Sequence, residues 1–292
     1  MFVNNLFLIT ISVFISTQLS FGQKNKVIIH PEKIVYKIID TTQLKLHVYR
    51  PLDFDTNTVY SSIIFFHGGG WNNGHPDMFK RQAMYFASRG MIAISAEYRI
   101  KNTHQTTPFE AVQDAKSAMR YVREHAKALH INPDMIAAGG GSSGGHLAAV
   151  CGNIEGLNAL TDNTKISAVP NALVLLNPVI DNGPNSFGYR RFMERYREIS
   201  PIHNISKEAP PTIILSGTKD KIIPITRLKS YQRKMEANGN RCDLVLYENV
   251  GHAFFAIPPI KYFIETTHEI DVFLQSLAFV KGQATIKIQY SY

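Results

Sequence analysis

Residues 135–149 read MIAAGGGSSGGHLAA: an apolar run, a turn of glycines and serines, and a second apolar run. The first run is typical of a buried β-strand, and the second is typical of a helix packed against it. The turn matches the pattern G-x-S-x-G, which holds a serine on a sharp, strained corner between strand and helix. Glycines on both sides of the serine carry no Cβ and therefore allow the two elements to approach closely. The stretch predicts a serine presented at the carboxyl end of a strand.

The G-x-S-x-G pattern fits this turn in two registers, one centred on Ser142 and the other on Ser143. Residues 139–144 also match G-x-G-x-x-G, but a dinucleotide-binding loop belongs in a first βαβ unit and this one lies mid-chain. A flexible linker would not be flanked directly by apolar strand and helix signals. A Walker A loop would need a lysine after its second glycine, and this turn has none there. A strand, a reactive-serine turn and a helix remain the preferred interpretation, with both serines as candidates.

An apolar strand at residues 62–66 runs upstream into the loop 67–71, HGGGW. Acyl transfer builds negative charge on a carbonyl oxygen, and backbone N–H groups that converge on this oxygen stabilise the charge. Glycines suit such a loop because they let the backbone approach the reacting group. The expected donors of this oxyanion hole are the N–H groups of Gly69, Gly70 and Ser143.

Two further polar residues follow consecutive strands downstream. Asp220 comes after an apolar stretch at residues 211–217, and His252 comes after a stretch at residues 243–247. A lone aspartate in such a place is more often a helix cap or turn residue, and a lone histidine beside aromatic residues more often packs in a core. Their positions after successive strands that follow the serine turn favour an acid and a base.

From about residue 28 to residue 277 the chain resembles the α/β-hydrolase esterases of the hormone-sensitive-lipase-like type. Bacterial acetylxylan and feruloyl esterases in this group share the HGGGW loop and the elbow G-G-S-x-G-G-H-L-A, and the family segment D-x-x-V-P has Ile223 for its valine here. The chain order serine, aspartate, histidine is also that of this fold. The resemblance implies a catalytic triad of Ser142, Asp220 and His252.

The same resemblance implies supporting roles for other residues. His67 holds the HGGGW loop and takes no part in the chemistry, Tyr98 packs, and Arg99 pairs with a carboxylate beneath the site. Position 143 departs from the family, because many relatives have alanine where this chain has Ser143. The change costs little, because this residue contributes its backbone N–H.

Composition agrees with one catalytic domain. The chain has 292 residues, of which 45% are hydrophobic and 11% aromatic, enough for a large core. Apolar strands alternate with helical stretches at residues 79–89, 108–129 and 227–238, which predicts an α/β fold with a mostly parallel central sheet flanked by helices. Ligands bind such sheets at the carboxyl ends of the strands.

The first 22 residues resemble a secretory signal peptide. An apolar run at residues 6–15 is short for a membrane span, and small residues precede Gln23, where cleavage is expected, although the segment before the run has no lysine or arginine. We therefore expect a signal peptide at residues 1–22, a catalytic domain at residues 23–292, a secreted or periplasmic protein, and no stable membrane insertion after cleavage.

Cys151 and Cys242 are too few for a disulfide framework, and we expect both to be packing residues, although a bridge between them is an alternative. The histidines show no metal-ligand spacing, and the expected mechanism uses neither a metal nor a cofactor. The formal net charge of +8 is scattered and accompanies no nucleic-acid motif, so no nucleic-acid partner is expected.

The densest basic segment lies at residues 189–197, YRRFMERYR, between two expected strands, where this fold often carries a lid over the pocket. A solvated amphipathic helix, with glutamates balancing part of the charge, is the simpler interpretation. The alternative is that an arginine of this short lid contacts a carboxylated or sulfated sugar. The candidates are Arg190, Arg191, Arg195 and Arg197.

Together these observations predict a serine esterase that removes acetyl or another short acyl group from a carbohydrate or related alcohol, with a small-molecule or oligosaccharide ester as its substrate. An arylformamidase or a peptidase-like hydrolase would use the same machinery. A non-catalytic ligand-binding protein on this fold is a third alternative, although such proteins often lose a triad residue. The sequence does not specify the oligomeric state.

Overall fold

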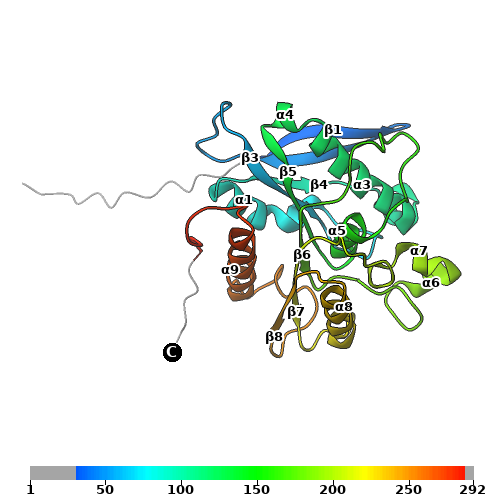
Figure 1. Cartoon of the computed structure of the whole chain (residues 1–292). Coiled ribbons are helices and arrows are strands. Elements are labelled where there is room, and N and C mark those ends of the chain that lie inside the picture. Colours follow the sequence, from blue (N-terminus) through cyan, green and yellow to red (C-terminus); the bar gives the residue numbers. More distant parts are fainter. Residues whose placement is uncertain (1–30, 287–292) are drawn as a thin grey trace, which may run out of the picture.

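The computed structural model describes residues 31–286, so the expected signal peptide at residues 1–22 lies outside the described residues. One sheet of eight strands, in the order β1-β2-β4-β3-β5-β6-β7-β8, runs through the molecule (Figure 1). β1 and β2 form an antiparallel pair, β2 is antiparallel to β4, and the remaining neighbours are parallel. The predicted mostly parallel sheet is confirmed. The strands are β1 (Glu32–Ile39), β2 (Thr42–Tyr49), β3 (Tyr60–Phe66), β4 (Ile92–Ala96), β5 (Ile131–Gly141), β6 (Ala172–Leu176), β7 (Thr212–Gly217) and β8 (Cys242–Tyr247).

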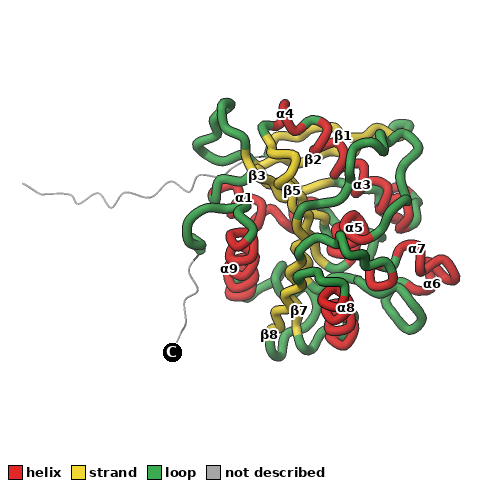
Figure 2. The backbone as a smooth tube through the Cα atoms, viewed as in Figure 1, coloured by secondary structure: helices red, strands yellow, loops and turns green. Residues whose placement is uncertain are grey.

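Helices cover both faces of the sheet (Figure 2). Three of them pack with the buried side chains of one face: α3 (Pro108–Glu124), α5 (Ser143–Asn153) and α8 (Ile225–Ala237). Two pack on the other: α1 (Lys80–Ser88) and α9 (Lys261–Ser276). The shorter elements are α2 (Lys101–His104), α4 (Ala126–Leu129), α6 (Tyr189–Phe192), α7 (Tyr196–Ile199) and three 3-10 turns at Pro76–Phe79, Met193–Arg195 and Pro201–His203. Among residues 31–286, no helix is both long and apolar enough to span a bilayer.

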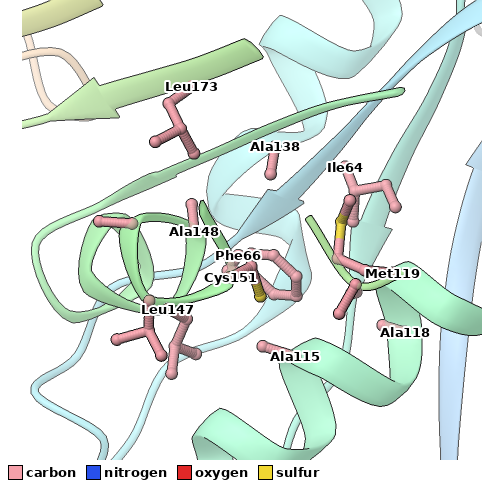
Figure 3. Packing of buried hydrophobic residues seen from close by; sticks show 14 of the residues in the cluster. Ile64, Phe66, Ala115, Ala118, Met119, Ala138, Leu147, Ala148, Cys151 and Leu173 are labelled. Carbon is pink, nitrogen blue, oxygen red and sulfur yellow. The ribbon is translucent and has the colours of Figure 1, made fainter. Parts of the chain in front are cut away.

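Small residues allow α5 and α3 to pack closely against the sheet. Ala148 and Cys151 of α5 and Ala115 of α3 lie in one buried cluster with Ile64 and Phe66 of β3 (Figure 3). Strand side chains on this face alternate with those on the other, where Phe65 packs against Phe79. The sheet is therefore buried on both faces, as its continuous apolar strands require.

The expected helices form with small differences in their limits. The stretch at residues 108–129 is interrupted at His125, whose φ of −96° and ψ of 16° separate α3 from α4. The basic segment at residues 189–197 is not one amphipathic helix, because Met193 with a φ of 47° breaks it into short turns. Cys151 lies within the helix after the serine turn rather than beyond it, and Cys151 and Cys242 are both free and buried.

A buried ion pair joins the two helices of the α1/α9 face. Asp271 of α9 is fully buried and lies 2.6 Å from Arg89 Nε and 2.6 Å from the hydroxyl of Tyr85. Removal of one partner from such a pair leaves an uncompensated buried charge.

We predict that Asp271→Ala lowers the free energy of unfolding by about 3 to 5 kcal/mol, because Arg89 keeps its charge in a buried position. The matched control is Asp243→Ala. Asp243 also pairs with an arginine, but both side chains of that pair are 40% exposed, so the loss should be below about 1 kcal/mol. Urea unfolding of the two variants measures the difference, and equal losses would contradict the prediction.

Candidate active site

The serine turn has the strained backbone that its sequence predicts. Ser142 has a φ of 54° and a ψ of −118°, a conformation that side-chain-bearing residues rarely adopt. Its N–H donates to the carbonyl of Leu176 in β6 at 2.9 Å. A Cβ added to Gly144 would lie 2.0 Å from the carbonyl oxygen of Phe66, and one added to Gly140 would lie 2.4 Å from the backbone of Gly144. Both glycines are therefore required for the contact between β3, β5 and α5.

The structure brings the three expected triad residues into one hydrogen-bonded chain. His252 Nε2 lies 2.9 Å from Ser142 Oγ, and His252 Nδ1 lies 2.7 Å from Asp220 Oδ2. Ser143 is fully buried in the first turn of α5, and its hydroxyl has no hydrogen-bond partner among the described residues. Of the two serines that the motif left open, the one in contact with His252 is Ser142.

Asp220 is held as a carboxylate by the groups around it. Its Oδ1 accepts the N–H groups of Ile222 at 2.8 Å and Ile223 at 2.9 Å, while Oδ2 faces His252. Burial by itself would raise the pKa of Asp220, but the hydrogen bonds from His252 and the two amides outweigh it and hold the pKa below its usual value. A carboxylate in this place fixes the imidazole with its proton on Nδ1 and leaves Nε2 to accept one.

The loop that carries His252 is fastened to the sheet by a residue that the sequence analysis missed. Asn177 follows β6 directly, is fully buried, and accepts the N–H of Ala253 on its side-chain Oδ1 at 3.0 Å. Ala253 needs that support, because its φ is 60°. The available sequence signal was a polar residue at the carboxyl end of a buried strand, where side chains of this site gather.

Hydrogen bonds orient the peptide units of the HGGGW loop. The N–H of Gly69 shares a peptide unit with the carbonyl of Gly68, which lies 2.8 Å from His67 Nδ1. The N–H of Gly70 shares a unit with the carbonyl of Gly69, which accepts the N–H groups of Asn72 at 3.1 Å and Asn73 at 3.3 Å. Both amides are thus held by partners on the opposite side of their own peptide planes. The third expected donor, the N–H of Ser143, lies in the first turn of α5, where helical N–H groups have no intrahelical acceptor.

His67 supports this loop from within the core. It stacks on Tyr98 with ring centroids 4.2 Å apart, and the Tyr98 hydroxyl donates to the His67 carbonyl at 2.7 Å. Burial lowers the pKa of His67 to about 4, so the ring is neutral at pH 7. Arg99 lies 2.8 Å from the buried carboxylate of Asp114.

Residues 181–200 form a short cap next to the HGGGW loop, on the side of α5 (Figure 1). Trp71 is 1% exposed, and its ring packs against Phe187 and Phe192 of the cap, with centroids 5.9 and 5.6 Å away, and against His146 of α5 at 4.9 Å. Arg191 places its guanidinium 5.5 Å from the Trp71 ring and donates to the carbonyl of Gly70. The cap therefore contacts the loop that holds the expected oxyanion donors.

The four arginines of the cap differ in their partners. Arg195 pairs with Glu198 at 2.8 Å and lies over the ring of Phe109. Arg197 lies over Tyr196, and Arg190, Arg191 and Arg197 form no salt bridge with any carboxylate of residues 31–286. A search of that same part of the chain finds no cluster of His, Cys, Asp and Glu side chains that could hold a metal ion.

Two family models match the chain in succession. A model described as BD-FAE matches residues 46–187, and a model of the dienelactone hydrolase family matches residues 187–270. Between them they contain all of the expected triad and oxyanion-hole residues.

Individual relatives are esterases. Esterase 2 of Thermogutta terrifontis, in a propionate-bound structure, is 38% identical with a TM-score of 0.83, over 87% of this chain and 97% of that one. The same enzyme phosphorylated by paraoxon is 37% identical with a TM-score of 0.83, over 88% of this chain and 98% of that one. Esterase LipC of Mycobacterium tuberculosis is 24% identical over 87% of this chain and 67% of its own length. The acetylxylan esterase of Xylanibacter ruminicola is 26% identical over 76% of this chain and 47% of its own length.

The chain thus spans about two thirds of LipC and about half of the acetylxylan esterase, but nearly all of the Thermogutta enzyme. The α/β-hydrolase fold expected from the sequence is confirmed by this match. With 38% identity to that enzyme over 97% of its length, the chain belongs to the α/β-hydrolase esterases, a family of carboxylic ester hydrolases.

Proposed function

We propose that this protein hydrolyses short-chain acyl esters, acetyl esters above all, of carbohydrates or related alcohols, through the triad Ser142, His252 and Asp220. The observation that carries the proposal is the position of His252, which contacts Ser142 Oγ with one ring nitrogen and Asp220 with the other. A base that is oriented by a carboxylate can take the hydroxyl proton as the oxygen attacks.

The proposed reaction has two halves. Ser142 Oγ attacks the ester carbonyl carbon while His252 Nε2 takes its proton, and the negative oxygen of the tetrahedral intermediate accepts the N–H groups of Gly69, Gly70 and Ser143. His252 then gives the proton to the departing alcohol. In the second half His252 takes a proton from water, which attacks the acyl-enzyme and releases the carboxylic acid and free Ser142.

Two findings support a short acyl group. The cap is small, since α6 and α7 have four residues each, and the Thermogutta esterase has been solved with propionate and with butyrate bound. The likeness to an acetylxylan esterase supports a carbohydrate as the alcohol. We also propose, from the sequence of residues 1–22 alone, that the protein is exported to the periplasm or the medium.

Two matched serine variants test the choice of nucleophile. Ser142→Ala should reduce esterase activity by about 10⁴-fold or more with the fold intact, because it removes the attacking oxygen. Ser143→Ala should keep most activity, because the hydroxyl is buried without a partner among the described residues and the backbone N–H remains. Paraoxon should label the peptide that contains Ser142 in the wild type and in Ser143→Ala but not in Ser142→Ala. The reverse labelling pattern would make Ser143 the nucleophile.

A second prediction concerns pH. Activity on p-nitrophenyl acetate should fall as the pH is lowered, in a single step, because protonation of His252 removes the base. Asp220 should add no step between pH 5 and 8, since its hydrogen bonds hold its pKa below the usual value of about 4 and it stays ionised there. EDTA should have no effect. A second acid step within that range, or activity restored by a divalent metal after EDTA, would contradict this mechanism.

The third prediction concerns the acyl chain. Each additional CH₂ adds about 0.8 kcal/mol of binding only where a pocket buries it, and this cap is short. Acetyl and butyryl p-nitrophenyl esters should therefore have a higher kcat/KM than decanoyl esters, without activation at a lipid interface. A kcat/KM that rises steadily to ten carbons would instead indicate a lipase-like enzyme.

A further inference from the structure

A hollow of about 400 Å³ opens on the cap beside the HGGGW loop. Six residues line it: Asn185, Ser186, Gly188, Tyr189, Arg190 and Arg191. The lining carries two guanidinium groups and no carboxylate. Its amide and hydroxyl side chains can also hydrogen-bond a polar ligand.

Both arginines of this hollow lack an acidic partner among residues 31–286, whereas other arginines nearby have one. Arg195 of the same cap pairs with Glu198, and Arg227 of α8 pairs with Asp181 at 2.7 Å. Two adjacent unpaired cations repel each other, and an anion between them would relieve that repulsion. The hollow therefore has the charge of an anion site.

Arg191 connects the hollow to the expected reaction centre. It donates to the carbonyl of Gly70, one of the expected oxyanion-hole residues, and its guanidinium lies 5.8 Å from the ring of Phe187. Burial lowers the pKa of Arg191, so part of the charge is desolvated. Since guanidinium has five N–H donors, the bond to Gly70 leaves others for a ligand.

We infer that this hollow binds a carboxylate carried by the alcohol part of the ester, and that the enzyme thereby selects acidic ester substrates. The inference rests on the proposed esterase function and names the substrate class of the same site. A carboxylate matches the planar fork of an arginine and can accept two parallel N–H groups from it. Arg190 supplies the unpaired charge, and Arg191 places the bound anion next to the oxyanion loop.

Two acetyl esters that differ by one charge test the inference: 4-acetoxybenzoate and 4-acetoxybenzamide. The quantity measured is the ratio of their kcat/KM values in the variants relative to the wild type, so that the different intrinsic reactivities of the two esters cancel. Arg190→Gln should lower this ratio about threefold to tenfold, the modest range expected for a partly exposed ion pair. In the wild type the ratio should also fall between 20 and 500 mM NaCl.

Arg197→Gln is the matched control, because it removes the same charge from the same cap at a residue that does not line the hollow. Its ratio should equal that of the wild type. Equal losses in Arg190→Gln and Arg197→Gln would show only a general field of the basic cap and would overturn the inference, as would an unchanged ratio in Arg190→Gln.

A binding measurement separates this inference from the proposed function. Ser142→Ala, which cannot form the acyl-enzyme, should bind 4-acetoxybenzoate more tightly than the benzamide in calorimetry, and Ser142→Ala combined with Arg190→Gln should lose that difference. If the wild type hydrolyses neither ester, the proposed function fails while the calorimetry still decides the anion site. Equal binding of both esters by Ser142→Ala would overturn the site.

Discussion

The whole site depends on how closely α5 approaches β3. The carbonyl oxygen of Phe66 occupies the space where any side chain at position 144 would begin, since a Cβ there would lie 2.0 Å from it. This contact sets the end of β3, from which the HGGGW loop departs, beside the turn that carries Ser142. The strain at Ser142, with its φ of 54°, is sustained because the strand before it and the helix after it are both buried. One backbone contact thus fixes the relative positions of the nucleophile and the expected oxyanion donors.

The base is positioned differently, through side chains rather than backbone contact. His252 lies on a loop, and only polar bonds hold it: Asp220 fixes its ring and Asn177 fixes the backbone that follows it. Asp220 follows β7 and Asn177 follows β6, so two neighbouring parallel strands deliver both supports to the same edge of the sheet. The parallel topology therefore supplies the geometry of the site as well as the core.

Local chemistry explains why much of this could be predicted from the sequence. A glycine-rich serine turn, a glycine loop after a strand, and an acid and a base after later strands are each recorded in a few adjacent residues, as is the alternation that gives the sheet. Asn177 was missed because its role is a long-range contact with Ala253, 76 positions away. The broken cap helix was missed for another reason, since the charge pattern of residues 189–197 suits a helix, while the packing of Phe192 against Trp71 and the turn at Met193 impose something else.

Trp71 explains why the cap has this shape. Its ring touches Phe187 and Phe192 of the cap and His146 of α5, so one side chain of the HGGGW loop is the common surface for all three. His146 donates from Nε2 to the carbonyl of Ile199 at 2.8 Å if its proton is on that nitrogen, which ties α5 to the far end of the cap. Burial lowers the pKa of His146 to about 4, so this ring stays neutral at pH 7 and can pack beneath the indole. The cap is therefore held by the same loop and helix that form the expected oxyanion hole, and a movement of the cap should be felt at the site of reaction.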